Sequence, residues 1–447
     1  MCMYLRYLLE IKKMKNENHC GIIARISVIP HPNPEVHSLA IGNCCNEQVL
    51  VSKSTPNDAV GIYFPCDLQI SECFAKANDL LRRKDPETGK NAGGMFDANR
   101  KVRAQTFKGI KSYGFWAPLS YLEKCGVDTS VLKEGDLIDK IGDIEICCKY
   151  ESPEQKQAKA RKQKEMTLMQ KIKAQIFAKE KAVTLFPEHK DTSHFLRNLH
   201  HFKTGDEVII SLKIEGTSQR FAYNWQLRPR KWYERLISKI GIHVDNRELR
   251  RYNGTRRVIL TDTSSGGYFS ESWRAKVAER ILPYLEPHQH VYAEVCGYEG
   301  QRTIAPKQEI KDKELRKQYG SKMVYTYGCP EGEFEIFVYR MSYVLESGKE
   351  IDMPWNNVKE WCDKHNIKTV PVLSRFIYDG DLEKLKKTVE ELSDGPDPID
   401  PRHIREGVCI RINGIEWKVF KQKSYLYRLL AGFNMEQTGF IDPEDVS

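Results

Sequence analysis

Leu212-Lys213-Ile214-Glu215-Gly216-Thr217-Ser218 closes an apolar run that begins at Val208. The run predicts a buried strand over residues 207–214, with a lysine near its end, a carboxylate two residues later and then a glycine. An ordinary lysine has a pKa of about 10.4 and is protonated at neutral pH. Burial, neighbouring cations or a divalent metal would each favour the neutral amine. Lys213 is therefore a candidate nucleophile if the rest of the chain brings such groups to it.

The composition is that of a folded protein with more than one domain. The 447 residues correspond to two or three domains of roughly 100–200 residues each. Apolar residues make up 40% of the chain and aromatic residues 10%, which is enough for ordinary hydrophobic cores. The net charge of +9 fits a nucleic-acid partner without requiring one.

The thirteen cysteines are scattered and form no paired CxxC motifs, although Cys44-Cys45 and Cys147-Cys148 are adjacent pairs. This pattern predicts reduced thiols and an intracellular, reducing compartment, either cytoplasmic or nuclear. No apolar run approaches the roughly 20 residues of a membrane span, so no membrane segment is expected. Residues 1–19 are expected to be a leader outside the folded domains and lack the features of a signal peptide.

Residues 20–150 are predicted to form a small OB-like β-barrel, because short apolar segments alternate with turn signals. The expected strands include residues 21–29, 39–41, 48–52 and 61–64. Within residues 100–115, cations alternate with apolar and aromatic side chains. Such a strand would present one basic face, with aromatic rings at hand for stacking on bases. Binding of nucleic acid and a merely solvated basic strand both remain open.

Residues 151–182 are predicted to be a helical junction, because they are rich in Lys, Gln, Ala and Glu and carry one apolar stripe at helical spacing. Residues 183–447 then mix strands and helices. The expected strands are 207–214, 256–260, 290–297, 333–343, 408–412 and 416–421, and the expected helices are 272–282, 356–365 and 382–392. The arginine-rich residues 228–251 could contact nucleic acid or a triphosphate, or could be a solvated insertion.

Four further charged segments follow the lysine stretch. Gly254-Thr255-Arg256-Arg257 precedes an apolar run, and Glu294 interrupts the apolar strand from Val291 to Cys296, where a carboxylate is costly to bury unless it is paired or metal-bound. Glu406-Gly407 stands at the start of another strand. Lys421 and Lys423 share one face of a strand, whose side chains repeat every two residues. Each segment alone is common, but their order is specific.

That ordered set resembles the covalent nucleotidyltransferase superfamily, which contains DNA ligases, RNA ligases and mRNA capping enzymes. Lys213-Ile214-Glu215-Gly216 is similar to its nucleotidyl-lysine motif, and residues 292–297 are similar to its glutamate strand. Residues 333–341 are similar to the strand that brings an aromatic ring onto the base, and residues 406–411 and 421–424 are similar to the last two nucleotide motifs.

The resemblance narrows to RNA ligases with an OB-fold module before the catalytic domain, the class usually numbered fifth. Residues 215–218 are similar to the RNA-ligase variant of the lysine motif, and residues 254–258 and 337–341 are similar to that class. Three features depart from it. The position of Glu215 is commonly Asp or His, the position of Arg340 is Asp in many ligases, and residues 228–251 have no evident counterpart.

The resemblance implies an α+β fold, with the OB-like β-barrel followed by a nucleotidyltransferase domain of antiparallel sheets and helices over residues 183–447. It implies an ATP-dependent RNA ligase that seals 5′-phosphate and 3′-hydroxyl ends of nicked or bridged RNA through lysyl-AMP and RNA-adenylate intermediates. ATP and Mg²⁺ or Mn²⁺ are the expected cofactors, RNA is the expected partner, and a monomer is the expected state.

The resemblance also assigns roles to residues. The catalytic residues would be Lys213, Lys421 and Lys423. The metal would be held by Glu215, Glu294 and Glu406. The nucleotide would be bound by the other five of these residues, which are Glu215, Glu294, Glu406, Lys421 and Lys423, together with Gly216, Arg256, Arg257, Phe337 and Tyr339. Either aromatic ring could stack on adenine, because both are expected to face the same way. RNA would be gripped by Arg103, Lys108 and Lys111.

Three alternatives remain. A capping-type guanylyltransferase would use GTP with the same lysine chemistry, but such enzymes normally carry an OB domain after the last lysine motif. Only 24 residues follow Lys423, which are too few for that domain and also speak against the usual layout of a DNA ligase. An RNA-binding scaffold with a degenerate catalytic domain is disfavoured by the presence of all the expected lysines and glutamates.

Overall fold

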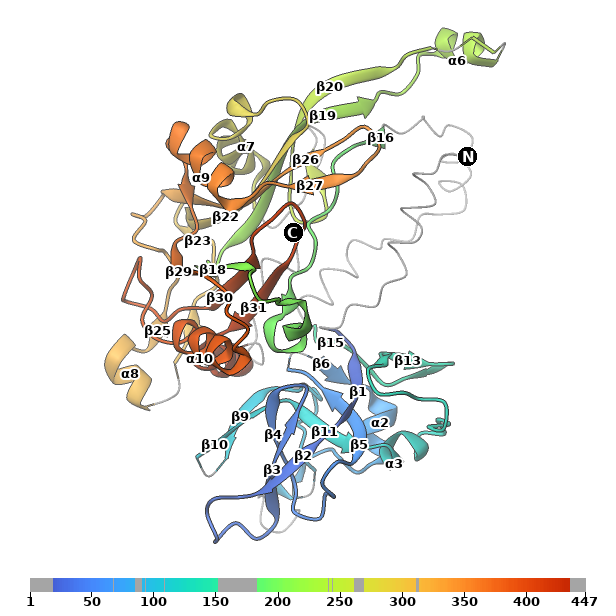
Figure 1. Ribbon diagram of the computed structural model, residues 1–447, viewed down its shortest axis with the longest axis vertical. Helices are drawn as coiled ribbons and strands as arrows, with labels where there is room; N and C mark the ends of the chain where they lie inside the picture. The colour runs from blue at the N-terminus through green and yellow to red at the C-terminus, as the bar shows by residue number, and fades with distance from the viewer. Residues whose placement is uncertain are drawn as a thin grey trace.

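The computed structural model describes residues 19–66, 68–84, 91–92, 94–107, 109–151, 183–239, 241–242, 244–260, 269–310 and 313–434. Two modules are visible in Figure 1, an N-terminal module in blue and cyan below and a larger C-terminal module in green to red above. The mixed α+β class is confirmed. Lys108, residues 1–18 of the expected leader and residues 152–182 of the expected helical junction lie outside the described residues.

The N-terminal module is built from short strands and two small helices. Its strands are β1 (Gly21–Arg25), β2 (Ser27–Pro30), β3 (Leu39–Cys44), β4 (Glu47–Ser52), β5 (Val60–Phe64), β6 (Leu68–Ile70), β7 (Arg83–Lys84), β8 (Asn91–Ala92), β9 (Ala104–Phe107), β10 (Ile110–Tyr113), β11 (Phe115–Pro118), β12 (Leu137–Ile138), β13 (Lys140–Ile141), β14 (Ile144–Glu145) and β15 (Cys147–Lys149). Its helices are α2 (Glu72–Ala77) and α3 (Ser120–Glu123).

These strands pair into several sheets. One has the order β11-β5-β1-β12, another the order β2-β3-β4, and the remaining strands form pairs. Side chains of β4 alternate between a buried and a half-exposed face. Glu47, Val49 and Val51 lie on the buried face, and the residues between them are half-exposed. Among the described residues the pairings do not close these sheets into a single barrel.

The C-terminal module contains two large sheets. Its strands are β16 (Val183–Thr184), β17 (Ser193–His194), β18 (Glu207–Leu212), β19 (Thr217–Leu227), β20 (Arg247–Gly254), β21 (Ile259–Leu260), β22 (Gln289–Glu299), β23 (Arg302–Thr303), β24 (Gln308–Glu309), β25 (Lys322–Met323), β26 (Phe334–Val344), β27 (Glu350–Asp352), β28 (Lys368–Thr369), β29 (Val372–Ile377), β30 (Gly407–Ile412) and β31 (Val419–Lys423). Its α-helices are α6 (Trp232–Lys239), α7 (Glu271–Glu279), α8 (Lys313–Tyr319), α9 (Trp355–Lys364), α10 (Leu382–Ser393) and α11 (Tyr425–Asn434), and its 3₁₀-helices are η2 (Phe195–Arg197), η3 (Leu199–His201) and η4 (Leu282–Tyr284).

The lysine stretch is the crossing between these two sheets. A nine-stranded sheet has the central order β21-β20-β19-β22-β26-β27, and a five-stranded sheet has the order β17-β31-β30-β18-β29. β18 belongs to the smaller sheet and β19 to the larger, so residues 213–216 step from one to the other. Both sheets contribute to one hydrophobic core, in which Leu212 of β18 packs with Val295 of β22. The expected strands at 207–214, 290–297, 333–343 and 408–412 are confirmed.

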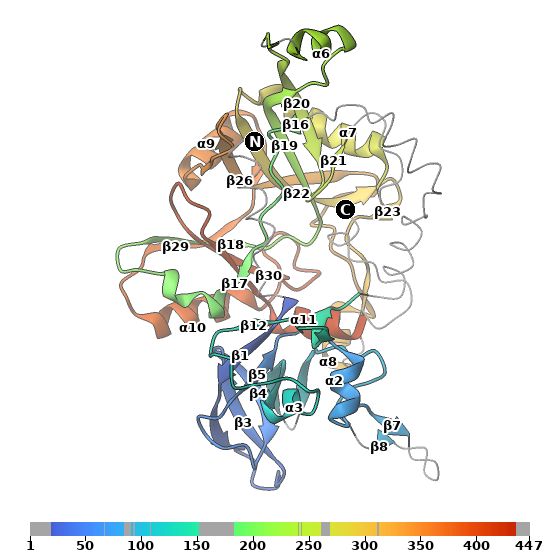
Figure 2. The same ribbon diagram turned by 90° about the vertical axis from the view of Figure 1, so that its right-hand side faces the viewer.

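A hairpin arm, residues 223–251, projects from the larger sheet. β19 and β20 pair from Arg220 and Gly254 out to Leu227 and Arg247, and α6 lies at the tip, at the top of Figures 1 and 2. The arginine-rich segment therefore forms a helix and a strand that the sequence did not indicate. At the other end of the module, α11 lies against the N-terminal module, and the ring of Tyr425 meets that of Tyr113 edge to face at 5.3 Å.

No helix in the described ranges has the length and apolar character that crossing a membrane demands. Every cysteine that the structure describes is a free thiol.

Candidate active site

Backbone contacts fix the crossing at both ends. The Leu212 N–H donates to Pro371 O at 2.8 Å, and the Lys213 N–H donates to Gly407 O at 3.0 Å. A Cβ on Gly216 would lie 2.4 Å from Val295 O, closer than any side chain tolerates. Glycine is therefore required here because β22 approaches the backbone directly.

The amine of Lys213 forms an ion pair with Glu406. Nζ lies 2.7 Å from Oε1 and 2.8 Å from Oε2. Lys423, on the neighbouring strand β31, places its Nζ 3.5 Å from the same Oε1. The Glu406 side chain is 1% exposed, whereas those of Lys213 and Lys423 are 16% and 27% exposed. One buried carboxylate thus holds two cations that solvent can still reach.

This arrangement defines a resting state. An opposite charge so close to an amine favours its protonated form. Lys213 can become a nucleophile when a bound nucleotide and its divalent ion separate its amine from Glu406. Gly407 allows the close packing of these strands, because its φ is +150° and a Cβ would lie 2.2 Å from Gln422 O.

Glu215 is buried and is engaged by two tyrosines. Its Oε2 accepts a hydrogen bond from Tyr427 Oη of α11 at 2.6 Å, and its backbone N–H donates to Tyr327 Oη at 2.6 Å. Burial, with the carboxylates of Asp397 and Glu406 nearby, raises the pKa of Tyr327 well above 10, so this phenol stays neutral. Neither tyrosine was a sequence candidate. The apolar helical pattern after Lys423, with tyrosines at 425 and 427, was the available signal for the second.

Glu294 lies opposite Ser218 in the register of β22 and β19. Ser218 Oγ donates to Glu294 Oε2 at 2.9 Å. Arg274 of α7 approaches from behind the sheet and donates to Thr217 Oγ1 at 2.9 Å. Burial lowers the pKa of Arg274 to about 10, against the opposing effect of Glu294, so the guanidinium remains charged at neutral pH. The sequence had not singled out Arg274.

Lys421 belongs to a second charged group, next to the first. β31 pairs with β17 so that Lys421 stands opposite His194. Arg256 forms an ion pair with Asp191, and its carbonyl accepts from the His189 N–H at 3.0 Å. Burial alone would raise the pKa of Asp191, but Arg256, Arg257 and Lys421 hold it below its ordinary value. Asp191 is thus the acidic partner of the expected phosphate-binding cations, and Arg257 is exposed.

The two aromatic candidates on β26 have different surroundings. The register with β22 shifts from Tyr292–Arg340 to Ala293–Val338, so a bulge skips Tyr339 and interrupts the simple alternation. Phe337 is buried in the core between the sheets. Tyr339 is half-buried and meets the ring of His189 edge to face at 5.6 Å.

Arg340, where many ligases have Asp, has a structural role. It is fully buried, with Nη2 2.9 Å from Glu350 Oε1 and 2.5 Å from Asp352 Oδ1. Its guanidinium lies over the rings of Tyr292 and Trp417, at 4.5 and 4.4 Å from their centroids. Two carboxylates and two aromatic faces therefore compensate the buried charge.

The three carboxylates expected to hold a metal each have a different protein partner. Glu215 contacts Tyr427, Glu294 contacts Ser218, and Glu406 contacts the lysines. Within the described ranges, no three His, Cys, Asp or Glu side chains gather as a metal-binding group. Mg²⁺ and its relatives commonly take one or two carboxylates together with substrate phosphates and water. The donors here fit that mode and do not form an all-protein cage.

Two of the residues expected to grip RNA, Arg103 and Lys111, lie in the described part of the chain, and each has a contact within the protein. Arg103 Nη2 lies 2.5 Å from Asp97 Oδ2 and is largely covered. Lys111 is exposed, and its Nζ lies 4.5 Å from the centre of the Tyr425 ring at the junction of the modules. The two side chains therefore lie in different surroundings, and Lys111 is in contact with α11.

Comparison with known proteins points to one family. Residues 206–423 match the family model described as RNA ligase. Similar solved structures include Naegleria gruberi RNA ligase with PPi (TM-score 0.59, 14% identity, covering 95% of this chain and 100% of that chain). Mutants of that protein with AMP and Mn (0.58, 14%, 94% and 100%) and with ATP and Mn (0.55, 14%, 92% and 98%) are also similar. No curated protein matches by sequence.

Proposed function

From the match of residues 206–423 to the family model described as RNA ligase, we propose that this protein is an ATP-dependent RNA ligase that joins 5′-phosphate and 3′-hydroxyl ends. The observation that carries the proposal is the pairing of Lys213 with Glu406, flanked by Lys423, at the crossing between the sheets. The Naegleria gruberi structures with ATP or AMP and Mn support ATP and Mg²⁺ or Mn²⁺ as cofactors here.

In the first step, Lys213 Nζ attacks the α-phosphorus of ATP. A nitrogen–phosphorus bond forms, the bond to pyrophosphate breaks and the amine loses its proton, which leaves lysyl-AMP. Lys421 and Lys423 stabilise the negative charge that grows on the phosphate oxygens. The neighbouring cations Lys421 and Lys423 and a divalent ion would favour the neutral form of the Lys213 amine that the attack requires, and the proton would leave to solvent.

The carboxylates and arginines would organise the nucleotide. Glu215, Glu294 and Glu406 would hold a divalent ion through water and phosphate oxygens, and the ion would supply Lewis-acid stabilisation of the phosphate charge. Arg256 and Arg257 would bind phosphate oxygens, since a guanidinium matches their geometry.

Two features would seat the base and the phosphates. Tyr339, which is half-buried, would stack on adenine, with Phe337 supporting the strand from the core side. Gly216 would keep the backbone close enough for the phosphates to approach.

The later steps transfer AMP to RNA. The 5′-phosphate of an RNA end attacks the phosphorus of lysyl-AMP and frees Lys213, and a 3′-hydroxyl then displaces AMP to form the phosphodiester. We propose a nicked or bridged RNA as substrate, an OB-type N-terminal module that grips it, membership of the fifth RNA-ligase class, a monomer, and a reducing intracellular compartment. Lys111 is the strongest candidate for RNA contact because its side chain is exposed.

The decisive experiment is covalent labelling. The protein is incubated with α-labelled ATP and Mg²⁺ or Mn²⁺, denatured and examined for retained label. We expect label on wild type and none on Lys213→Ala, because no other group replaces the nucleophile. Lys359→Ala, on the exposed face of α9, is the matched control. Equal label on wild type and Lys213→Ala would exclude Lys213 as the nucleophile.

Two variations test the alternatives. Labelling from GTP in place of ATP would favour the capping-type guanylyltransferase. RNA binding by a wild-type protein that never takes up label would favour a scaffold. Sealing assays on nicked duplexes with an RNA or DNA 3′-hydroxyl strand then identify the substrate.

A further inference from the structure

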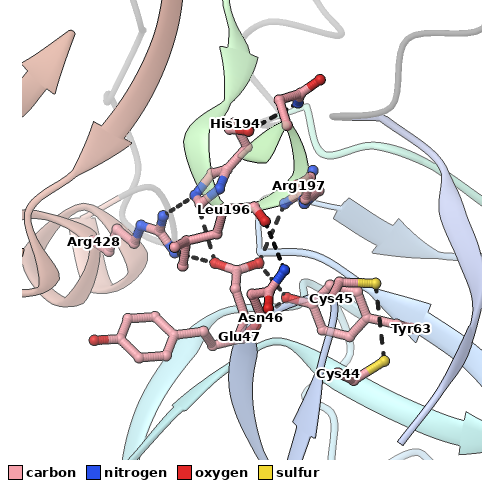
Figure 3. A network of polar contacts seen from close by, with 11 residues as sticks. Cys44, Cys45, Asn46, Glu47, Tyr63, His194, Leu196, Arg197 and Arg428 are labelled. Carbon is pink, nitrogen blue, oxygen red and sulfur yellow. Dashed lines mark hydrogen bonds and ion pairs between the residues drawn. The ribbon is translucent and has the colours of Figure 1, made fainter. Parts of the chain in front are cut away.

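A buried carboxylate of the N-terminal module is held by the C-terminal module. Glu47 begins β4 and is 3% exposed. Its Oε1 lies 3.0 Å from Arg428 Nη1 of α11 and 3.5 Å from His194 Nε2 of β17, and its Oε2 lies 3.4 Å from Arg197 Nη2 of η2. Figure 3 shows these side chains converging on Glu47. We call Glu47, His194, Arg197 and Arg428 the junction cluster.

The charges of the junction cluster are complementary across the modules. Burial would raise the pKa of Glu47, but the guanidinium groups of Arg428 and Arg197 hold it well below its ordinary range, so Glu47 is ionised. His194 is neutral, because burial lowers its pKa well below 6.5 and its Nε2 accepts from Arg428, which an imidazolium cannot do. Tyr63 of the N-terminal module donates to Glu47 Oε2 at 2.6 Å. Separated, each module would leave an unmatched charge.

Two members of the junction cluster are neighbours of residues in the candidate active site. Arg428 follows Tyr427, whose hydroxyl donates to Glu215 at 2.6 Å. His194 stands opposite Lys421 in the pairing of β17 with β31. Both elements that bear these contacts, β31 and α11, are consecutive in the chain. A displacement of Arg428 therefore moves the helix that orients Glu215.

Other contacts of α11 with the N-terminal module act at its first turn. The hydroxyls of Tyr425 and Thr106 share a hydrogen bond, and the Tyr425 ring meets that of Tyr113. Arg428 Cζ lies 5.4 Å from the centre of the same Tyr113 ring. The helix is thus held by the N-terminal module on one side and contacts Glu215 on the other.

We propose that Glu47 is a positioning residue for lysine adenylylation. Through Arg428 it fixes α11, so that Tyr427 orients Glu215. The N-terminal module is then a part of the nucleotide site as well as a support for RNA. This inference rests on the proposed function.

The test moves the Glu47 carboxylate without removing its charge. Glu47→Asp withdraws it by one methylene, and Tyr427→Phe removes the hydrogen bond to Glu215. We expect each variant to lower the adenylylation rate at saturating ATP about tenfold, with KM for ATP within about twofold, because orientation and not ground-state binding is lost. Glu134→Asp, an exposed glutamate of the same module, is the control and should keep the wild-type rate.

The double variant Glu47→Asp/Tyr427→Phe shows whether Glu47 positions Glu215 through Tyr427 or only stabilises the fold. If Glu47 acts through Tyr427, the double variant should be no slower than the slower single variant, because coupled residues are not additive. If the two effects multiply, or if folded Glu47→Asp has the wild-type rate, the inference is wrong. Arg428→Lys perturbs the same contact from the other module and decides the matter if Glu47→Asp does not fold.

The outcome for wild type keeps the two proposals distinguishable. If wild type takes up no label, the ligase assignment and the positioning role both fail. If wild type and Glu47→Asp are labelled at the same rate, only the positioning role fails.

Discussion

Two ion-pair clusters flank β31 and α11, and each has one buried carboxylate shared among cations. At the candidate active site, Glu406 holds Lys213 and Lys423. At the junction, Glu47 holds Arg428 and Arg197, whose side chains are each only 8% exposed. The lysines of the first cluster are two to three times more exposed than these arginines. Solvent access therefore distinguishes an ion pair that a substrate can open from one that fastens two modules.

The largest effect on stability is expected at the junction. Glu47→Gln leaves Arg428 and Arg197 buried without their carboxylate, which should lower the free energy of unfolding by about 3–5 kcal/mol. Urea unfolding followed by circular dichroism measures the change. Glu134→Gln, whose ion pair with Arg25 is exposed, should change it by less than about 0.5 kcal/mol. A loss below about 1 kcal/mol for Glu47→Gln would show that the junction cluster does not fasten the modules.

The candidate active site should respond in the opposite way. Glu406→Gln should slow labelling from α-labelled ATP about a hundredfold. A neutral amide holds a divalent ion more weakly than a carboxylate does, and that ion stabilises the negative charge on the phosphate. The melting temperature should change by only about 2 °C, since the released lysines can be hydrated. Glu416→Gln, an exposed glutamate just before β31, is the matched control. A large loss of stability without a loss of rate would reverse the distinction between the clusters.

The smallest effect is a change in pH dependence. Burial lowers the pKa of His194 well below 6.5. Below pH 6.5, His194 is therefore protonated in the unfolded chain and remains neutral in the folded chain. The contribution of His194 to the free energy of unfolding is therefore fully present above pH 6.5 and is lost as the pH falls below that value. His194→Gln should therefore reduce the slope of unfolding free energy between pH 6 and 5 by up to about 1.4 kcal/mol per pH unit.

Urea titrations of wild type and His194→Gln at several pH values measure this slope. The exposed His37→Gln is the control. Glu47 adds its own loss only below its unfolded pKa of about 4.5, outside this window. Equal slopes for wild type and His194→Gln would mean that His194 is charged in the folded protein.

The strands that carry the site could be predicted because their patterns are local. Residues 207–214, 290–297 and 408–412 are nearly continuous apolar runs, which indicate strands buried on both faces. β19 was not predicted, because Gln219, Arg220 and Asn224 interrupt its pattern although all three are buried. Their partners, such as Thr255 O for Arg220, come from distant segments that leave no local signal.

Within the site, the order of the lysines and glutamates marks them as candidates in the sequence, whereas their contact partners leave no signal there. The pairing of Lys213 with Glu406 spans 193 residues, and the contact of Tyr427 with Glu215 spans 212. The bulge that separates Phe337 from Tyr339 depends on the register of β22, which a period of two cannot reveal. Glu47, just before the expected strand at 48–52, was not a sequence candidate, because its countercharges lie in the other module.

The span of the junction cluster has a consequence during synthesis. Glu47 and Arg428 are 381 residues apart in the chain. At a translation rate of about 5–20 residues per second, roughly 20–80 s pass between the synthesis of Glu47 and that of Arg428. During that interval Glu47 can pair with Arg197, which is 150 residues away in the chain, but not with Arg428. The contact between Glu47 and α11 is therefore expected to form late in folding.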